Sequence, residues 1–105
     1  GLKYLSELDR QFKKMIKNKE ERIKFVLAAY NSGIAHVLDA RRLAKKYDRN
    51  PNLWDDNVDY FMKNKSNPEY FTDSVVQHGY SNGVVSFNFV NDILNRYEHY
   101  KNVIE

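Results

Sequence analysis

The chain has 105 residues, no cysteine, a formal charge of +3 and an aromatic content of 14%, with eight Tyr residues. This length suits one domain with a modest core, so we predict a single domain over residues 1–105. The lack of Cys excludes disulfides and thiolate metal sites. The sequence has no apolar run of about 20 residues, so we expect no transmembrane segment in this chain.

The first third of the chain has apolar residues at spacings of three and four, which indicates amphipathic helices. We predict one helix over about residues 3 to 16, with an inward face formed by Leu5, Leu8, Phe12, Met15 and Ile16. A second helix is expected to begin at Asn18 or Lys19 and to run to Tyr30. Its first turn then holds Glu20 and Glu21, whose negative charge suits the helix dipole.

The middle of the chain contains a third helical pattern and a less regular stretch. We predict a helix over about residues 34 to 47, with an inward face formed by Val37, Leu38, Leu43, Ala44 and Tyr47. Residues 48–52 are interpreted as a loop, residues 53–62 as a short helix and residues 63–68 as another break.

The last part of the chain is also predicted to be helical. Asn67 can cap a helix that has Pro68 in its first turn, and Asn82 can cap the last helix. The expected inward face of that last helix is Val85, Phe89, Ile93, Tyr97, Tyr100 and Ile104. No alternation typical of β-strands competes with these patterns, so the predicted fold class is all-α.

The end of the second helix carries the most informative residues. Glycine just past a helix commonly adopts the left-handed conformation that caps it, so Gly33 marks where this helix ends. Tyr30 and Asn31 then lie on the last turn, where a phenol and a carboxamide can face a groove. The alternative is an ordinary helix end with a buried Tyr, because such cap signals are common.

Several short blocks resemble one family, in the same order along the chain. Residues 29–33, Ala-Tyr-Asn-Ser-Gly, resemble the Ala-Tyr-Asn-x-Gly motif of lytic transglycosylase domains, which have a lysozyme-like helical fold. Further blocks are similar to the membrane-bound branch of that family: Gly-x-x-Tyr-Leu at 1–5, the helix with Asp-Ala-Arg at 36–44, Asn-Pro-Asn at 50–52 with Trp54, Gly-Tyr-x-x-Gly at 79–83, and Phe89-Val90 with Ile93.

This resemblance implies a peptidoglycan lytic transglycosylase, which cleaves the β-1,4 bond between N-acetylmuramic acid and N-acetylglucosamine and leaves a 1,6-anhydro end. The family's catalytic Glu, usually followed by Ser and upstream of Gly-x-Met-Gln, has no counterpart in this chain, because Glu7, Glu20 and Glu21 lack that context. We therefore interpret the chain as the C-terminal helical part of a lysozyme-like transglycosylase domain, inactive alone. The implied partners are peptidoglycan strands and the missing N-terminal half of the domain, in the periplasm or at the outer membrane.

The resemblance also implies a set of site residues. The expected substrate-binding residues are Tyr30, Asn31, Tyr80 and Trp54, and the residues expected to shape the motif are Gly33, Gly79, Gly83 and Phe89. In this scheme Tyr30 lies near the catalytic Glu, and Asn31 fixes the turn or contacts an acetamido group. Tyr and Trp present a flat apolar face with a polar rim, which suits sugar rings. Glycine lets the backbone approach a ligand closely.

Two positions depart from the family pattern. Val85 stands where the family usually has an acidic residue, and Phe89 stands where it usually has Tyr. Valine cannot supply a carboxylate to the groove, and the loss of the phenol removes a hydrogen-bonding group. The alternative function is therefore a non-catalytic peptidoglycan-binding module derived from the same fold.

The sequence supports neither a metal nor a cofactor. His36, His78 and His99 lie far apart without the spacing of metal ligands. A basic cluster could contact nucleic acid phosphates; it consists of Arg41, Arg42, Lys45 and Lys46. The small net charge and the flanking Asp39 and Asp48 favour a solvated helix face instead, so we expect no nucleic acid partner.

Overall fold

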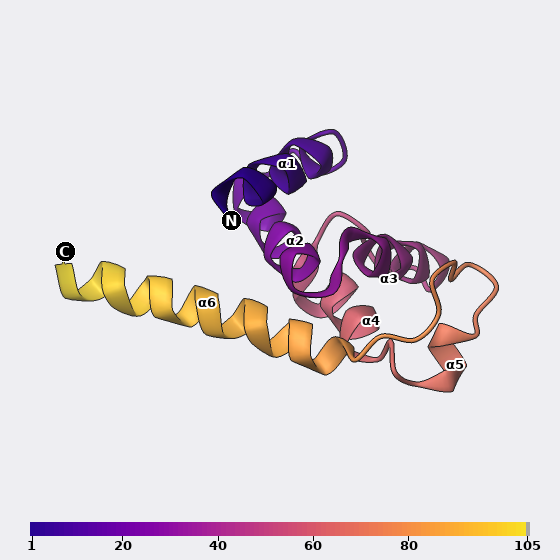
Figure 1. Cartoon of the computed structure of the whole chain (residues 1–105). Helices are drawn as coiled ribbons and strands as arrows, with labels where there is room; N and C mark the ends of the chain where they lie inside the picture. The colour runs from indigo at the N-terminus through magenta and orange to yellow at the C-terminus, as the bar shows by residue number, and fades with distance from the viewer. Residues whose placement is uncertain (105) are drawn as a thin grey trace.

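The protein is a set of α-helices from which the last helix extends (Figure 1). The computed structural model describes the backbone of residues 1–104 and the surroundings of the side chains of residues 1–98. Its elements are α1 (Leu2–Lys13), α2 (Lys19–Ser32), α3 (Ile34–Lys46), η1 (Trp54–Val58), α4 (Asp59–Lys63), α5 (Pro68–Phe71) and α6 (Gly83–Ile104). The described residues contain no β-strand, so the all-α prediction is confirmed.

The first two helices form as the apolar spacing predicts. Asn18 caps α2, because its side-chain oxygen accepts a hydrogen bond from the Glu21 amide at 2.9 Å. Arg22, on the next turn, is buried and ties the two helices together. Its guanidinium donates to the Asp9 carboxylate at 2.8 Å and to the Ile16 carbonyl at 3.1 Å, at the end of the α1 segment.

The core lies between α1, α2, α3, α4 and the start of α6. Phe25 of α2 is fully buried, and its ring meets Phe12 at 5.9 Å and Trp54 at 5.3 Å between centroids. The apolar side chains buried with it are Leu8, Ile16, Val26, Ala28, Ala29, Val37, Ala40, Leu43, Ala44, Val58, Phe61, Met62 and Val90. The core therefore follows the predicted inward faces of the first and third helices, although Tyr47 is 44% exposed.

The stretch predicted as one short helix over 53–62 is instead a kinked turn followed by a short helix. Within η1, Asp55 has an extended ψ of 128° and Asp56 a positive φ of 59°, so regular helix begins only at Asp59. Asp tolerates the left-handed conformation better than most residues, which suits Asp56 to this turn. The next helix, α5, begins as predicted: Asn67 accepts a hydrogen bond from the Glu69 amide, and Pro68 lies in the first turn.

The predicted inward face of the last helix is wrong in register. Over residues 83–98, the described side-chain positions of α6, the buried ones are Gly83, Ser86 and Val90, whereas Val85 is 52% exposed and Tyr97 is 61% exposed. Only the beginning of α6 packs on α2 and α4, and the rest runs away from the other helices (Figure 1). The side chains of Tyr100 and Ile104 lie outside the described part of the chain.

The close packing of α6 on α4 depends on Gly83. A Cβ atom at this position would lie 1.5 Å from the Met62 carbonyl oxygen, so the helix can approach α4 only without a side chain there. None of the described helices is long and apolar enough to cross a membrane.

Candidate functional site

Tyr30 lies where three helices meet. Its ring is on the last turn of α2, stacks with Phe89 of α6 at 6.3 Å and 19°, and tilts against Tyr4 of α1 at 5.8 Å. Tyr30 is 40% exposed, so it is not the buried tyrosine of an ordinary helix end. We call Tyr4, Tyr30 and Phe89 the aromatic surface.

Asn31 and Gly33 fix the turn beside Tyr30. The Asn31 side-chain oxygen accepts a hydrogen bond from the Ser86 hydroxyl at 2.7 Å, which joins α2 to the start of α6. Gly33 has φ 97° and ψ 141°, a conformation that glycine adopts far more readily than other residues, and its amide donates to the Ala29 carbonyl. The helix therefore ends at Gly33 as predicted, but the residue has a positive φ with an extended ψ instead of the left-handed helical conformation, and it turns the chain directly into α3.

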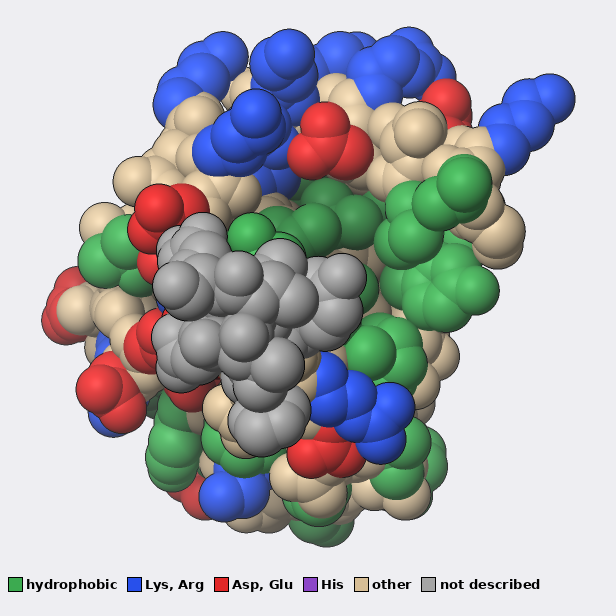
Figure 2. Space-filling view, turned by 90° about the vertical axis from the view of Figure 1, so that its left-hand side faces the viewer, with side chains coloured by type: hydrophobic (Ala, Val, Ile, Leu, Met, Phe, Trp, Pro, Cys, Tyr) green, Lys and Arg blue, Asp and Glu red, His purple; other side chains and the backbone are tan. Residues whose placement is uncertain are grey.

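The aromatic surface lies on the side of the molecule from which α6 extends. Figure 2 looks at the left-hand side of the view in Figure 1 and shows exposed hydrophobic side chains, with a row of Lys and Arg along the top, where α1 lies in Figure 1. This face thus combines exposed apolar side chains with nearby positive charge.

Tyr80 lies on a different part of the chain, the irregular segment 72–82 between α5 and α6. It is 58% exposed, and its ring meets Phe71 edge-on at 5.8 Å. Gly79 before it has φ 64°, which lets the segment turn. Tyr80 is therefore exposed at the surface, and its ring packs against Phe71 and is not part of the aromatic surface.

Two site expectations do not match the structure. Trp54 is fully buried against Phe25, and its backbone amide donates to Glu21 at 2.8 Å, so its ring belongs to the core and does not line a surface groove. Gly83 does permit a close backbone approach, but the neighbour is the Met62 carbonyl of α4. Both residues are used for packing within the chain.

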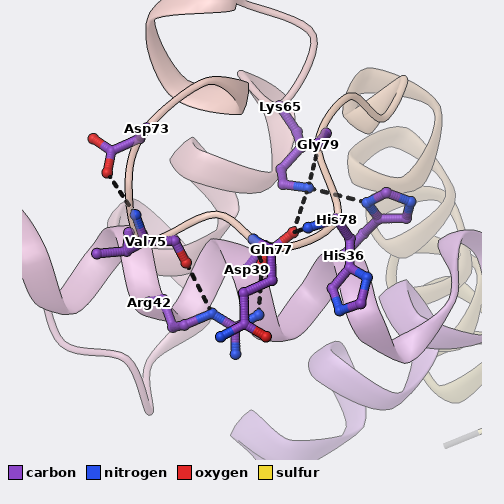
Figure 3. A network of polar contacts seen from close by, with 9 residues as sticks. All are labelled: His36, Asp39, Arg42, Lys65, Asp73, Val75, Gln77, His78 and Gly79. Atoms are coloured by element: carbon purple, nitrogen blue, oxygen red, sulfur yellow. Dashed lines mark hydrogen bonds and ion pairs between the residues drawn. The ribbon is translucent and has the colours of Figure 1, made fainter.

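A buried group of charges, which the sequence did not reveal, lies between α3 and the segments that flank α5 (Figure 3). We call it the buried ion cluster: Asp39, Lys65, Arg42 and His36. The side chains of Asp39 and Lys65 are completely inaccessible to solvent and pair at 2.9 Å. Arg42 donates to the other Asp39 oxygen at 2.5 Å, and the Lys65 ammonium lies 3.0 Å from His36 Nδ1.

The cluster shifts the ionisation of its members. Burial alone would raise the pKa of Asp39, but hydrogen bonds from the Gln77 amide, Arg42, Lys65 and the His78 amide together lower this pKa to about 2. Burial, and then the positive charge of Lys65, lower the pKa of His36 below its usual 6.5. At neutral pH the carboxylate is therefore charged and the imidazole is neutral.

The basic cluster of α3 is largely engaged inside the protein. Arg41 donates to the Pro51 carbonyl at 2.9 Å and to the Asn52 side chain at 2.6 Å, and thereby holds the loop after α3. Lys46 pairs with Asp73 at 2.8 Å. Within the described residues, no group of three or more His, Asp or Glu is placed to hold a metal ion; the side chain of His99 lies beyond them.

The sequence comparisons place the chain among relatives of bacterial murein transglycosylases. No family model matches the chain. The relatives found are named membrane-bound lytic murein transglycosylase F, and the chain is similar to a C-terminal part of them. The one from Pectobacterium atrosepticum is 37% identical over 93 residues, and one from Yersinia pestis is 39% identical over 93 residues. Each match covers 89% of this chain and 18% of the relative.

A third relative, from Pasteurella multocida, is 38% identical over 106 residues, which covers 98% of this chain and 21% of the relative. The chain thus spans about a fifth of the length of the curated relatives it matches. The resemblance to lytic transglycosylases, first indicated by the short motifs, is confirmed over nearly the whole chain.

Proposed function

We propose that this chain is part of a peptidoglycan lytic transglycosylase and supplies one wall of its glycan-binding groove. The observation that carries the proposal is the exposed Tyr30 ring on the last turn of α2, beside Asn31 and stacked on Phe89. The names of the relatives, which are murein transglycosylases, support the same activity class.

The reaction proposed for the complete domain needs one acid–base group. A Glu supplied from outside this chain protonates the leaving glycosidic oxygen and takes the proton of the 6-hydroxyl of the N-acetylmuramic acid. That oxygen attacks the anomeric carbon of the same sugar, so the β-1,4 bond breaks and a 1,6-anhydro ring forms. Glycosidases that use water need a second carboxylate. Here the intramolecular hydroxyl takes the place of water, and its orientation becomes the main task of the groove.

The residues of this chain would orient the glycan and the acid. Tyr30 would hydrogen-bond near the catalytic Glu, and its 40% exposure on the last turn of α2 supports this role. Asn31 is held by Ser86 and keeps the turn in place, and its amide nitrogen can meet an acetamido group. Tyr80 would extend the wall as a platform for a sugar ring.

Digestion of purified peptidoglycan tests this proposal. The digest is run with this chain and with a full-length protein that carries it, and the products are analysed by mass spectrometry. We expect anhydro-muropeptides from the full-length protein and none from this chain alone. Hydrolytic products with a free reducing end, or anhydro products from this chain alone, would contradict the proposed chemistry or the proposed place of the acid.

A non-catalytic peptidoglycan-binding module is the second candidate. Val85 is 52% exposed on α6, one helical turn before Phe89, so packing does not require a valine there. A carboxylate could therefore occupy this position, and the chain has an apolar side chain instead. Binding to peptidoglycan without any cleavage product from the full-length protein would favour this alternative over the enzyme.

The rest of the domain is the partner that we propose for the aromatic surface, in a protein of the bacterial cell envelope. Apolar side chains exposed on this side include Leu2 at 84% and Tyr4 at 45%, next to the half-exposed Tyr30. An exposed apolar group of this kind usually marks an interaction site. Hydrogen exchange of this chain alone should show weak protection of α1 and the end of α2, and strong uniform protection in a monomer would contradict this partner.

A further inference from the structure

We propose that the buried ion cluster positions the segment 77–80 and so presents Tyr80 to the glycan. Asp39 and Lys65 are then positioning residues of the glycan site, although neither touches the surface. The inference rests on the proposed function in one respect, namely that Tyr80 contacts the sugar. The placement of the segment itself is independent of that function and can be tested separately.

The cluster holds three successive residues by their backbone atoms (Figure 3). The two carboxylate oxygens of Asp39 accept from the Gln77 amide at 2.8 Å and from the His78 amide at 2.9 Å. The Lys65 ammonium donates to the Gly79 carbonyl at 2.6 Å. Tyr80 is the next residue, so its starting point and direction are set by these three bonds.

Backbone atoms on both sides of residues 77–80 are also hydrogen-bonded to Arg42 and Lys65. Arg42 donates to the Val75 carbonyl at 3.1 Å while it also bonds Asp39. The Ser81 amide lies 3.4 Å from the Lys65 carbonyl, after Tyr80. Residues 72–82 form no helix or strand. Their backbone groups must therefore find other partners, and the cluster supplies them.

Completely buried charges make this arrangement specific. An unpaired charge in the interior is very costly, so Asp39 and Lys65 each require the other and the hydrogen bonds around them. Lys65 uses its three donors on Asp39, Gly79 and His36. A movement of the segment away from α3 would leave both Asp39 oxygens without these backbone donors. The Tyr80 ring is 58% exposed and meets Phe71 edge-on, so the backbone bonds before it contribute to its direction.

His36 makes the arrangement sensitive to pH. Its neutral Nδ1 can accept from Lys65, whereas protonated His36 presents a second positive charge to that ammonium. The charged and titratable groups that face His36 are Lys65 from the loop before α5, Asp39 from its own helix, and His78 from the segment that is held. Arg42 completes the set through its bond to Asp39.

The test combines a double variant that lacks the two completely buried charges with measurements of glycan binding. Asp39→Asn combined with Lys65→Met removes both buried charges together, and Lys46→Met is the matched control, because it breaks the exposed ion pair with Asp73 on the same segment. We expect the double variant to lose hydrogen-exchange protection at the Gln77 and His78 amides. Its Kd for soluble glycan strands prepared from peptidoglycan should rise about two- to tenfold, the scale of one aromatic contact, while the control does neither.

The Tyr80→Ala background shows whether the effect acts through Tyr80. We expect Tyr80→Ala to weaken glycan binding, and the double variant to weaken it no further in that background. A further loss of binding there would overturn the role of the cluster in presenting Tyr80. No effect of Tyr80→Ala would refute Tyr80 as a glycan contact, whereas unchanged amide protection in the double variant would refute the positioning itself.

A titration of the unaltered chain provides a measurement that needs no destabilised variant. The amide proton shifts of Gln77 and His78 should follow the protonation of the His36 imidazole by NMR, with a midpoint below pH 6.5. His36→Gln keeps a hydrogen-bond acceptor that cannot be protonated in this pH range, so the pH dependence of the two amide shifts should disappear. Chemical shifts of the Gln77 and His78 amide protons that do not change as His36 titrates would contradict the proposal.

Discussion

The aromatic surface and the buried ion cluster both join distant parts of the chain, the first through partly exposed ring contacts and the second through buried ion pairs and hydrogen bonds. Each joins elements that are distant in the sequence: Tyr30 meets Tyr4 and Phe89, and Asp39 meets Lys65 and the 77–78 amides. Tyr30 is 40% exposed and its ring contacts allow some change of angle, whereas Asp39 and Lys65 are wholly buried and depend on directed bonds. The comparison indicates that the cluster fixes the shape of the chain, whereas the aromatic surface offers partly exposed rings to the rest of the domain and to the glycan.

The largest effect should come from breaking the cluster. Lys65→Met leaves the Asp39 carboxylate buried without its ammonium, so we expect the free energy of unfolding to fall by about 3–5 kcal/mol. Urea denaturation followed by circular dichroism measures this change. Lys46→Met is the control, and its exposed ion pair should contribute far less. Equal losses from the two variants would mean that the buried pair has no special role.

A smaller effect should come from the packing that holds the aromatic surface in place. Gly83→Ala puts a Cβ against the Met62 carbonyl, so α6 must move from α4, and we expect a loss of about 3 kcal/mol. Phe89 should then separate from Tyr30, which the ring contacts in NMR spectra would report. Gly79→Ala is the control: its Cβ meets no atom within 4 Å, so only its φ of 64° opposes it, at about 1 kcal/mol.

The sequence predicted the features that depend on local spacing. The boundaries of α2 and α3, the cap at Asn18, the start of α5 at Asn67 and the positive φ at Gly33 all follow from residues within one or two helical turns. Such features need no knowledge of the rest of the fold, because their hydrogen bonds are made within the segment itself. The helix end alone left a buried Tyr30 open, and only the family resemblance favoured the exposed position that the structure has.

The sequence could not predict the features that depend on distant partners. Asp39 and Lys65 are 26 residues apart, and nothing near either one shows that both are buried. Trp54 reads as an exposed aromatic until Phe25 is known to pack against it. The register of α6 was misjudged because Ser86 and Gly83 are the inward residues, and their small or polar side chains carry no apolar signal. Contact with α2 and α4 selected that face.

The next effect in size is the loss of stability at low pH, which tests whether hydrogen bonds keep Asp39 of the buried ion cluster charged. Asp39 has a pKa of about 2 in the folded protein, below its ordinary 3.8, so the unfolded chain binds a proton first as pH falls. The resulting stability of about 2 kcal/mol is present above pH 4 and is lost as pH falls toward 2. NMR titration of the Asp39 carboxyl carbon should give a midpoint near 2. A midpoint near 4 would show that its hydrogen bonds do not outweigh its burial.

The smallest effect on stability should come from a substitution of Tyr30. The same substitution should have a large effect on activity. Tyr30→Phe keeps the ring stacked on Phe89 and removes only an exposed hydroxyl, so the free energy of unfolding should change by no more than about 0.5 kcal/mol. If that hydroxyl orients the acid, release of anhydro-muropeptides by the full-length protein should fall at least about tenfold, the scale of a hydrogen bond to a charged group. Tyr97→Phe removes a phenol hydroxyl from an exposed tyrosine outside the aromatic surface, and it serves as the control. Unchanged turnover in Tyr30→Phe would make the proposed role of the phenol wrong and leave Tyr30 as part of the packing between α1, α2 and α6.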